Sequence, residues 1–323
     1  MEEWIRNQSF CITGGTGALG SSLLKKLIDS GARNIVILDQ RDPLTDYKEF
    51  NNLCVDFIKG SILNKYHVSK AVKRCSVLFH LAALIHAGNS ALSPLSYMKV
   101  NCLGTFNVLE ACREQGVPQV IYTSTGHVYG RPCGIPVNED HSTIPLSLYA
   151  ASKLAGESLM HAYAASFGIS TIIARLANLY SELSVSDTVI GCALDQVSSG
   201  QGIELRNLSA VRDFLYIEEA AEALIRLAMV PRSKYESLVV NVSPGYGVSV
   251  GELCEVLADI AEEQGMERPH IIKNMGHYEE QVTTLILDNR LLKKLVGWTP
   301  QITLREGLSR SLWKRLSGSV RKS

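Results

Sequence analysis

The chain has 323 residues, of which 46% are hydrophobic and 20% charged, and its 32 lysines and arginines balance 32 aspartates and glutamates. This composition is typical of a soluble globular protein with enough apolar material for one large or two medium domains. A net charge of zero provides no basic surface, so we expect neither nucleic acid nor an anionic membrane as a partner.

The N-terminus and the cysteines predict a cytoplasmic protein. The opening MEEWIR is too acidic and too poor in apolar residues for a signal peptide, and no apolar run is long enough for a membrane helix. The cysteines form no CxxC pair and several lie in apolar runs, which indicates reduced, partly buried thiols. Neither cysteines nor histidines cluster at ligand spacing, so we expect no metal site.

Strand and helix patterns alternate along the first half of the chain. Residues 9–13 are a short apolar run that stops at glycines, and residues 19–30 show helical spacing that ends at Gly31. Continuous apolar runs follow at 34–38, 77–81, 119–123 and 170–174, and helical stretches lie at 100–115 and 149–167. Continuous runs are typical of strands buried on both faces. We therefore predict an α/β fold with a Rossmann-type, doubly wound parallel sheet.

The second half of the chain has shorter elements and predicts a smaller C-terminal α/β lobe. Helical stretches are expected at 188–199, 251–264 and 289–296. We assign residues 1–178 to the first domain, with 213–245 returning to it, and residues 179–212 and 246–312 to the second lobe. The basic residues 313–323 are interpreted as a helix end and a frayed tail.

A glycine-rich turn predicts a dinucleotide site. Gly14, Gly17 and Gly20 lie between the first strand and the first helix, where small residues let the backbone approach a pyrophosphate at the helix N-terminus. We include Ala18 and Leu19, which lie between the last two glycines, in this site.

The end of the second strand bears on the choice of cofactor. Asp39 lies there, where a carboxylate can accept hydrogen bonds from ribose hydroxyls and repel a 2′-phosphate, so we expect NAD rather than NADP. Arg41 weakens that preference, because it could pair with a phosphate.

Several further motifs occur in a characteristic order. They are His80-Leu-Ala-Ala83, Asn101 with Gly104-Thr105, Thr125 before Val128-Tyr129-Gly130, Tyr149 with Lys153, Arg212-Asp-Phe214 and Gly297-Trp-Thr-Pro300. With the glycine turn, they make the chain resemble the extended short-chain dehydrogenase/reductase superfamily, and most nearly its NDP-sugar epimerase/dehydratase branch. The resemblance covers nearly the whole chain and implies an NAD-binding first domain and a substrate-binding second lobe.

The resemblance implies a catalytic trio. Tyr149 would be the acid/base, and Lys153, one helical turn on, would support it and hold the nicotinamide ribose. A nearby ammonium and the positive nicotinamide would lower the pKa of the tyrosine. Thr125 would hydrogen-bond the reacting oxygen of the substrate.

The resemblance also implies further cofactor contacts. Leu81, Ala82 and Ala83 match a segment that passes the adenosine, and Ser61 and Ile62 match residues beside adenine. The serine departs from the acid found there in many relatives, which puts one adenine hydrogen bond in doubt. Asn101 matches a residue that shapes the active-site helix, and a helix cap is the alternative interpretation.

The residues after Thr125 discriminate between reactions. Hexose 4,6-dehydratases usually carry Asp-Glu where this chain has Gly126 and His127. This favours an epimerase, most plausibly at C4, that works by transient oxidation to a keto-sugar and hydride return. A dehydratase or 4-ketoreductase that uses His127 as acid or base, a sterol-type or small-alcohol dehydrogenase, and a non-catalytic NAD-binding sensor or scaffold remain alternatives.

Substrate evidence from the sequence is mixed. The resemblance implies that Asn178 touches a sugar nucleotide (UDP-, dTDP- or GDP-linked), that Arg212 binds its diphosphate, and that His127 contacts the substrate. Ser181-Glu182 and the acidic stretch 276–281 depart from the family pattern. Relatives commonly dimerise through the helices at 100–115 and 149–167, so we expect a homodimer.

Overall fold

The computed structural model describes residues 1–42, 55–85, 90–184, 186–232, 236–273 and 284–318. Its centre is a seven-stranded sheet with the order β11-β6-β5-β4-β1-β2-β3, in which all neighbouring strands are parallel. In chain order the strands are β1 (Ser9–Thr13), β2 (Asn34–Asp39), β3 (Val55–Lys59), β4 (Val77–His80), β5 (Gln119–Thr125), β6 (Ser170–Leu176) and β11 (Ser237–Val242). The predicted Rossmann-type sheet is therefore confirmed.

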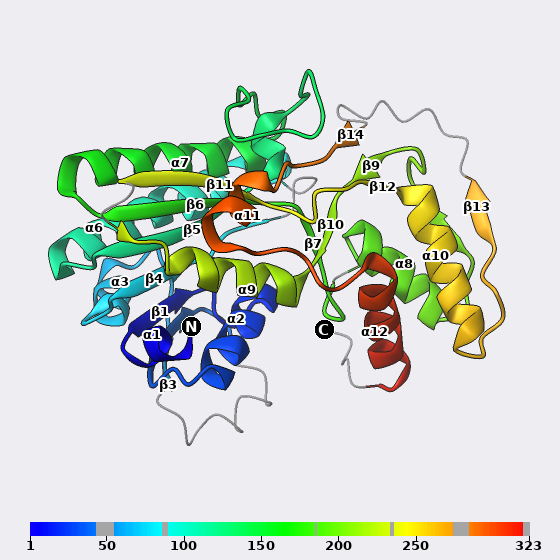
Figure 1. Cartoon of the computed structure of the whole chain (residues 1–323), viewed down its shortest axis with the longest axis horizontal. Helices are drawn as coiled ribbons and strands as arrows, with labels where there is room; N and C mark the ends of the chain where they lie inside the picture. The colour runs from blue at the N-terminus through cyan, green and yellow to red at the C-terminus, as the bar shows by residue number, and fades with distance from the viewer. Residues whose placement is uncertain (43–54, 86–89, 185, 233–235, 274–283, 319–323) are drawn as a thin grey trace.

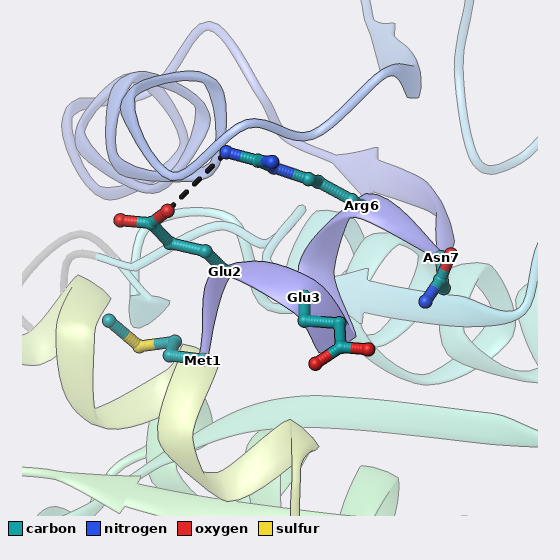
Figure 2. Close-up of a pocket in the computed structure, with 5 residues that line it drawn as sticks. All are labelled: Met1, Glu2, Glu3, Arg6 and Asn7. Atoms are coloured by element: carbon teal, nitrogen blue, oxygen red, sulfur yellow. Dashed lines mark hydrogen bonds and ion pairs between the residues drawn. The ribbon is translucent and has the colours of Figure 1, made fainter.

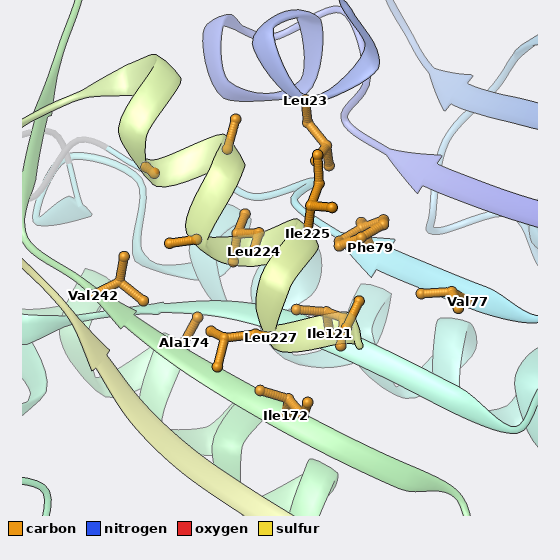
Figure 3. Close-up of a cluster of buried hydrophobic side chains, with 14 of the residues drawn as sticks. Leu23, Val77, Phe79, Ile121, Ile172, Ala174, Leu224, Ile225, Leu227 and Val242 are labelled. Atoms are coloured by element: carbon orange, nitrogen blue, oxygen red, sulfur yellow. The ribbon is translucent and has the colours of Figure 1, made fainter. Parts of the chain in front are cut away.

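Alternate residues of the central strands fill two separate cores, because successive side chains of a strand point to opposite faces. Phe79 and Ile121 face one core, beneath α2 (Ala18–Asp29) and α9 (Ile217–Ala228). Figure 3 shows this core, with Leu224 and Leu227 of α9 lying over the sheet. Helix α1 (Glu2–Arg6) packs at the edge of the same core.

The opposite face of the sheet is covered by α3 (Lys65–Val72), α6 (Gly104–Gln115) and α7 (Leu148–Phe167). Leu78, Val120 and Tyr122 point into this second core. The short helix α5 (Pro94–Tyr97) and the π-helix η2 (Met98–Leu103) lead directly into α6. Helices on both faces bury the inner strands of the sheet, which explains the continuous apolar runs of those strands.

The smaller lobe lies beside the edge of the sheet at which the strands have their carboxyl ends (Figure 1). Its core is built by α8 (Val189–Ser198), α10 (Val250–Glu263) and α12 (Leu304–Leu316). The short strands β8 (Ile203–Leu205) and β13 (Ile271–Lys273) pair with each other, as do β7 (Asn178–Tyr180) and β10 (Phe214–Tyr216). A three-stranded sheet joins β12 (Val248–Ser249), β9 (Val211–Arg212) and β14 (Thr284–Leu285), and α11 (Arg290–Val296) packs back on β11.

Strand β3 and helix α3 are among the elements of the first domain that were not predicted from the sequence. Strand β3 lies at the sheet edge, and its exposed Asp56 and Lys59 interrupt the apolar run that marks the inner strands. Helix α3 has a weakly apolar sequence, and its start is fixed by Asn64, whose side chain accepts from the backbone N–H groups of Tyr66 and His67. Edge strands and short capped helices depend on such local contacts more than on hydrophobic periodicity.

The cysteines outside residues 43–54 are all free thiols, and four of the seven are buried. Within the described ranges no group of three or more acidic, histidine or cysteine side chains is arranged to hold a metal ion. No helix among the described residues has both the length and the apolar character needed to cross a membrane.

Candidate active site

The carboxyl edge of the central sheet brings the predicted catalytic residues together. Thr125 is the last residue of β5 and also the N-cap of the 3₁₀ helix η3 (Gly126–Tyr129). Tyr149 and Lys153 lie in the first two turns of α7, which packs against β5 and η3. Ser147 caps α7 by accepting from the backbone N–H of Ala150 at 3.1 Å, which sets where the first turn begins.

Tyr149 is buried and directed at Thr125. The Thr125 side chain is near enough to act on the pKa of Tyr149, and the ring of Tyr97 meets the Tyr149 ring edge-on with centroids 6.5 Å apart. Burial raises the pKa of Tyr149 to about 12, and the neighbouring Thr125 acts in the opposite direction.

The surroundings of Lys153 act on its own charge in two directions. Lys153 is only 3% exposed, and burial lowers its pKa to about 7 while Glu157 acts against that change. The carboxylate of Glu157 therefore favours the protonated amine that the sequence predicted beside the phenol.

The three predicted substrate residues also converge. His127, in η3, lies near Asn178 and Arg212, and burial followed by the charge of Arg212 lowers the pKa of the imidazole. Asn178 begins β7, and Arg212 ends β9 in the middle of its small sheet. A neutral imidazole, an amide and a guanidinium therefore face the same region from three segments that are distant in sequence. The acidic stretch 276–281 lies outside the described residues.

The glycine turn has the form that a dinucleotide phosphate needs. Gly14 has a φ of 75°, and a Cβ added there would lie 2.7 Å from the backbone nitrogen of Ala82. A Cβ on Gly20 would lie 2.3 Å from the carbonyl oxygen of Gly14, so α2 can approach the turn only with glycine at this position. Gly17 is the N-cap of α2 and offers no capping side chain. The backbone N–H groups at the start of the helix, where Ala18 and Leu19 lie, are therefore suited to bind an anion.

Two further observations fit a cofactor at this turn. The hydroxyl oxygen of Thr16 is buried and has no hydrogen-bond partner among the described residues. The carboxylate of Asp39 accepts from the backbone N–H of Thr16 at 3.0 Å and from that of Arg41 at 3.1 Å, so it lies against the turn. Each carboxylate oxygen keeps a further lone pair for a ribose hydroxyl. The residues present therefore fit NAD.

A buried hydrogen-bond chain sets the segment after β4 in place. His80 receives a hydrogen bond at Nδ1 from the hydroxyl of Thr13 (2.7 Å) and donates from Nε2 to the hydroxyl of Thr105 (2.9 Å), which in turn donates to a backbone carbonyl. Burial lowers the pKa of His80 to about 3, so the imidazole is neutral. The three residues that follow, Leu81, Ala82 and Ala83, run over the glycine turn, and Ala82 donates its N–H to Thr13.

Asn101 links that segment to the catalytic helix. It is buried in the π-helix η2, where its amide bonds both backbone groups of Leu84 (2.8 and 3.0 Å) and donates to the hydroxyl of Ser152 (2.8 Å). Its side chain therefore bridges two segments and caps no helix. A π-helical turn of this kind is frequently found at functional sites.

Ser61 and Ile62 form the turn after β3. The Ser61 hydroxyl accepts from the backbone N–H of Leu63 at 3.2 Å, so it stabilises this turn. Ile62 is buried, and the space beside it requires glycine at position 104, because a Cβ there would lie 2.5 Å from Ile62.

Sequence reasoning did not assign several residues around the site. Tyr122 and Glu157 lie next to Lys153, Asp213 joins three chain segments, and Leu287 lies over Gly126. Glu157 follows Lys153 by one helical turn, a spacing that could have identified it. Asp213 was noted only as part of the motif Arg212-Asp-Phe214, and Leu287 carries no local signal, because only the tertiary fold brings it near η3.

A surface hollow away from this edge is lined by Met1, Glu2, Glu3, Arg6 and Asn7 (Figure 2). It lies beside α1, which precedes the amino end of β1, whereas the residues described above follow the carboxyl ends of the strands. In open α/β sheets ligands bind at the carboxyl ends of the strands. We therefore place the active site at the carboxyl edge.

Comparisons with known proteins agree with this geometry. A sequence profile of the NAD dependent epimerase/dehydratase family matches residues 10–243. A Methanocaldococcus jannaschii protein, provisionally named a UDP-glucose 4-epimerase, is 32% identical over 93% of this chain and 95% of its own length. The chain therefore belongs to the NAD-dependent epimerase/dehydratase family.

Solved structures have the same fold over almost the whole chain. MoeE5, solved with UDP-glucose and NAD, is 30% identical with a TM-score of 0.83 and covers 96% of this chain and 99% of its own. The Thermus thermophilus UDP-glucose 4-epimerase, solved with NAD, is 26% identical with a TM-score of 0.84 and covers 97% of this chain and 100% of its own.

Proposed function

We propose that this protein is an NAD-dependent epimerase that inverts carbon 4 of a UDP-linked sugar. The observation that carries the proposal is the closeness of Tyr149 to Thr125 at the carboxyl edge of the sheet, with Lys153 one turn along. The UDP-sugar 4-epimerases among the relatives support the choice of reaction. MoeE5 with UDP-glucose and NAD supports the choice of ligands.

Each residue at the site has a chemical role in this proposal. NAD, when bound, supplies the hydride acceptor that allows carbon 4 to pass through a ketone and be reduced on its other face. Tyr149 removes the proton of the 4-hydroxyl group and gives it back, and Thr125 holds the same oxygen by a hydrogen bond. Lys153 donates to the nicotinamide ribose and stabilises the phenolate of Tyr149.

The rest of the site would hold the cofactor and the nucleotide. Gly14, Gly17, Gly20 and the start of α2 bind the pyrophosphate of NAD, and Asp39 binds the adenosine ribose. Leu81–Ala83, with Ser61 and Ile62, border the adenosine. Arg212 binds the diphosphate of the substrate, beside His127 and Asn178.

A 4,6-dehydratase is disfavoured by the packing of η3. A Cβ added to Gly126 would lie 3.0 Å from Cδ1 and 3.1 Å from Cδ2 of Leu287. A side chain at position 126 would therefore require Leu287 to move. Residue 287 is held there by backbone hydrogen bonds of its two neighbours to Val137, at 2.8 Å each.

The reaction itself provides the test. The purified protein is incubated separately with UDP-glucose, UDP-galactose, UDP-glucuronic acid and UDP-N-acetylglucosamine and a trace of NAD, and products are separated by chromatography. We expect the 4-epimer of at least one sugar to form without net NADH production. Loss of water from the sugar would identify a dehydratase, and stoichiometric NADH consumption a reductase. Conversion of none of the four sugars would reject the proposal.

Replacing Tyr149 provides a residue-level test. Tyr149→Phe removes the acid/base group and should lower turnover by about 10²- to 10⁴-fold while NAD still binds. The matched control is Tyr163→Phe, near the other end of α7, where the hydroxyl donates to Glu110 at 2.7 Å and lies outside the site. Turnover by Tyr149→Phe at the rate of this control would show that the phenol has no catalytic role.

We also propose the two-lobe division and a homodimer. Residues 1–178 and 213–245 would bind the cofactor, and residues 179–212 and 246–312 would bind the substrate. The segment 92–103, which contains α5 and η2, supports a subunit interface, because Leu92, Leu95, Met98 and Leu103 are 82%, 64%, 42% and 49% exposed. Large apolar side chains concentrated in so short a segment are typical of protein–protein contact surfaces.

A further inference from the structure

The side chain of Lys153 lies in an environment that opposes its positive charge. It is 3% exposed, and a buried ammonium group is stable only when nearby groups compensate for lost hydration. Two side chains are placed to do so. The Nζ atom lies 4.2 Å from the centroid of the Tyr122 ring, and Glu157 follows on the same face of α7.

Tyr122 is held so that its ring faces the amine. It is fully buried in β5, and its hydroxyl donates to the backbone carbonyl of Lys153 at 3.2 Å. The helix can come this close only because residue 156 is glycine, since a Cβ there would lie 2.2 Å from the Tyr122 hydroxyl oxygen. Burial raises the pKa of Tyr122 well above its usual value, so the ring remains a neutral phenol. Its π face can then attract a cation.

Glu157 is a buried carboxylate, only 2% exposed and tied in place from two sides. Its Oε1 accepts from the hydroxyl of Ser124 at 2.5 Å, and its Oε2 lies 2.7 Å from Nη2 of Arg175. These contacts fix the carboxylate next to the second turn of α7, where its charge favours the protonated amine of Lys153.

The other titratable groups that act on Lys153 carry no compensating charge at neutral pH. His80 is held neutral, with its pKa lowered to about 3 by burial and by Lys153 itself. Burial raises the pKa of the Cys102 thiol and of the Tyr149 phenol, so both stay protonated. The Tyr122 ring and Glu157 are therefore the groups that favour the cation.

We propose that Tyr122 and Glu157 are positioning residues that hold the side chain of Lys153 as an ammonium ion, between an aromatic face and a carboxylate, at the cofactor side of α7. The catalytic use of that ammonium rests on the proposed function, but its protonation can be measured without turnover. Loss of either group should make the amine release its proton at lower pH.

The test is a pH titration of lysine Cε carbons by NMR in selectively labelled protein, with the Lys153 signal identified by Lys153→Arg. We expect a midpoint near the pKa of about 7 in the wild-type protein. Glu157→Gln should lower it by about one pH unit. Its matched control, Ser124→Ala, removes one hydrogen bond but keeps the carboxylate and should keep the midpoint.

Tyr122 is tested by changing the ring without changing its shape. Tyr122→Phe keeps an electron-rich face and should keep the Lys153 midpoint. Tyr122→pentafluorophenylalanine reverses the charge of that face and should lower the midpoint by about one pH unit. Because the two side chains are nearly the same size, this comparison remains valid even where Tyr122→Leu fails to fold.

The proposal is overturned if the fluorinated ring and Glu157→Gln both leave the midpoint of Lys153 unchanged in folded protein. If the proposed function also holds, UDP-sugar turnover at pH 8 should fall about tenfold in the same two variants. A shifted midpoint in a protein that converts no sugar would reject the proposed function alone.

Discussion

Asp213 shows how one buried carboxylate connects the segments around the substrate residues. Its Oδ2 accepts from the backbone N–H of Leu287 at 2.9 Å and from the hydroxyl of Ser243 at 2.7 Å. Asp213 directly follows Arg212 in the chain. Its Oδ1 is buried and has no partner among the described residues. Burial raises the pKa of Asp213 from 3.8 to about 6.

The raised pKa of Asp213 predicts a pH-dependent stability. Between pH 3.8 and 6 the folded protein binds the carboxyl proton of Asp213 more tightly than the unfolded chain does. The contribution of Asp213 to stability therefore falls as pH rises through that window. For a pKa shift of this size, the free energy of unfolding at neutral pH is lowered by about 3 kcal/mol. Asp213→Asn removes the titration, so its stability relative to the wild type should rise by about that amount from pH 4 to pH 7.

Urea unfolding at several pH values measures this difference. The comparison of variant and wild type at each pH cancels the titration of all other groups. A relative stability that stays constant from pH 4 to pH 7 would show that Asp213 titrates normally in the folded protein.

At the scale of elements, the glycine turn and α2 form one unit, in which Gly17 and Gly20 have different roles. Gly20→Ala would place a Cβ 2.3 Å from the carbonyl oxygen of Gly14, so the backbone must shift. We expect a loss of about 1–3 kcal/mol in stability and weaker NAD binding.

Gly17→Ala is the matched comparison for this prediction. Its Cβ would lie 3.3 Å from the nearest atom, so the fold should tolerate it, although the methyl group enters the predicted pyrophosphate site. Thermal unfolding should therefore separate the two variants, whereas NAD titration should show weaker binding in both. Equal melting temperatures for Gly20→Ala and the wild type would contradict the packing described here.

Hydrophobic patterns predicted some elements better than others. The inner strands β1, β4, β5 and β6 are buried on both faces and were found from their apolar runs. Residues 100–103 of the π-helix η2 were predicted as ordinary helix, because a π-turn differs only in which backbone groups pair.

At the scale of the whole molecule, the exposed apolar side chains of α5 and η2 predict the oligomeric state. Leu95→Glu places a charge on the proposed interface and should convert a dimer to a monomer. Leu316→Glu, at the end of α12, is the matched control, because Leu316 is also an exposed helical leucine. Light scattering after gel filtration measures both masses, and a monomeric wild type would reject the proposed homodimer.

The sequence by itself predicted the doubly wound parallel sheet and the glycine turn, because these depend on local spacing and on strands buried along their whole length. The trio Thr125, Tyr149 and Lys153 was implied by the family resemblance. The family followed from the order of those motifs and is confirmed. Only the tertiary structure decided the electrostatics of the site. Burial against Tyr122 and the distant contacts of Glu157 and Asp213 set the protonation of the groups, and neither burial nor a contact between remote segments is written in local sequence.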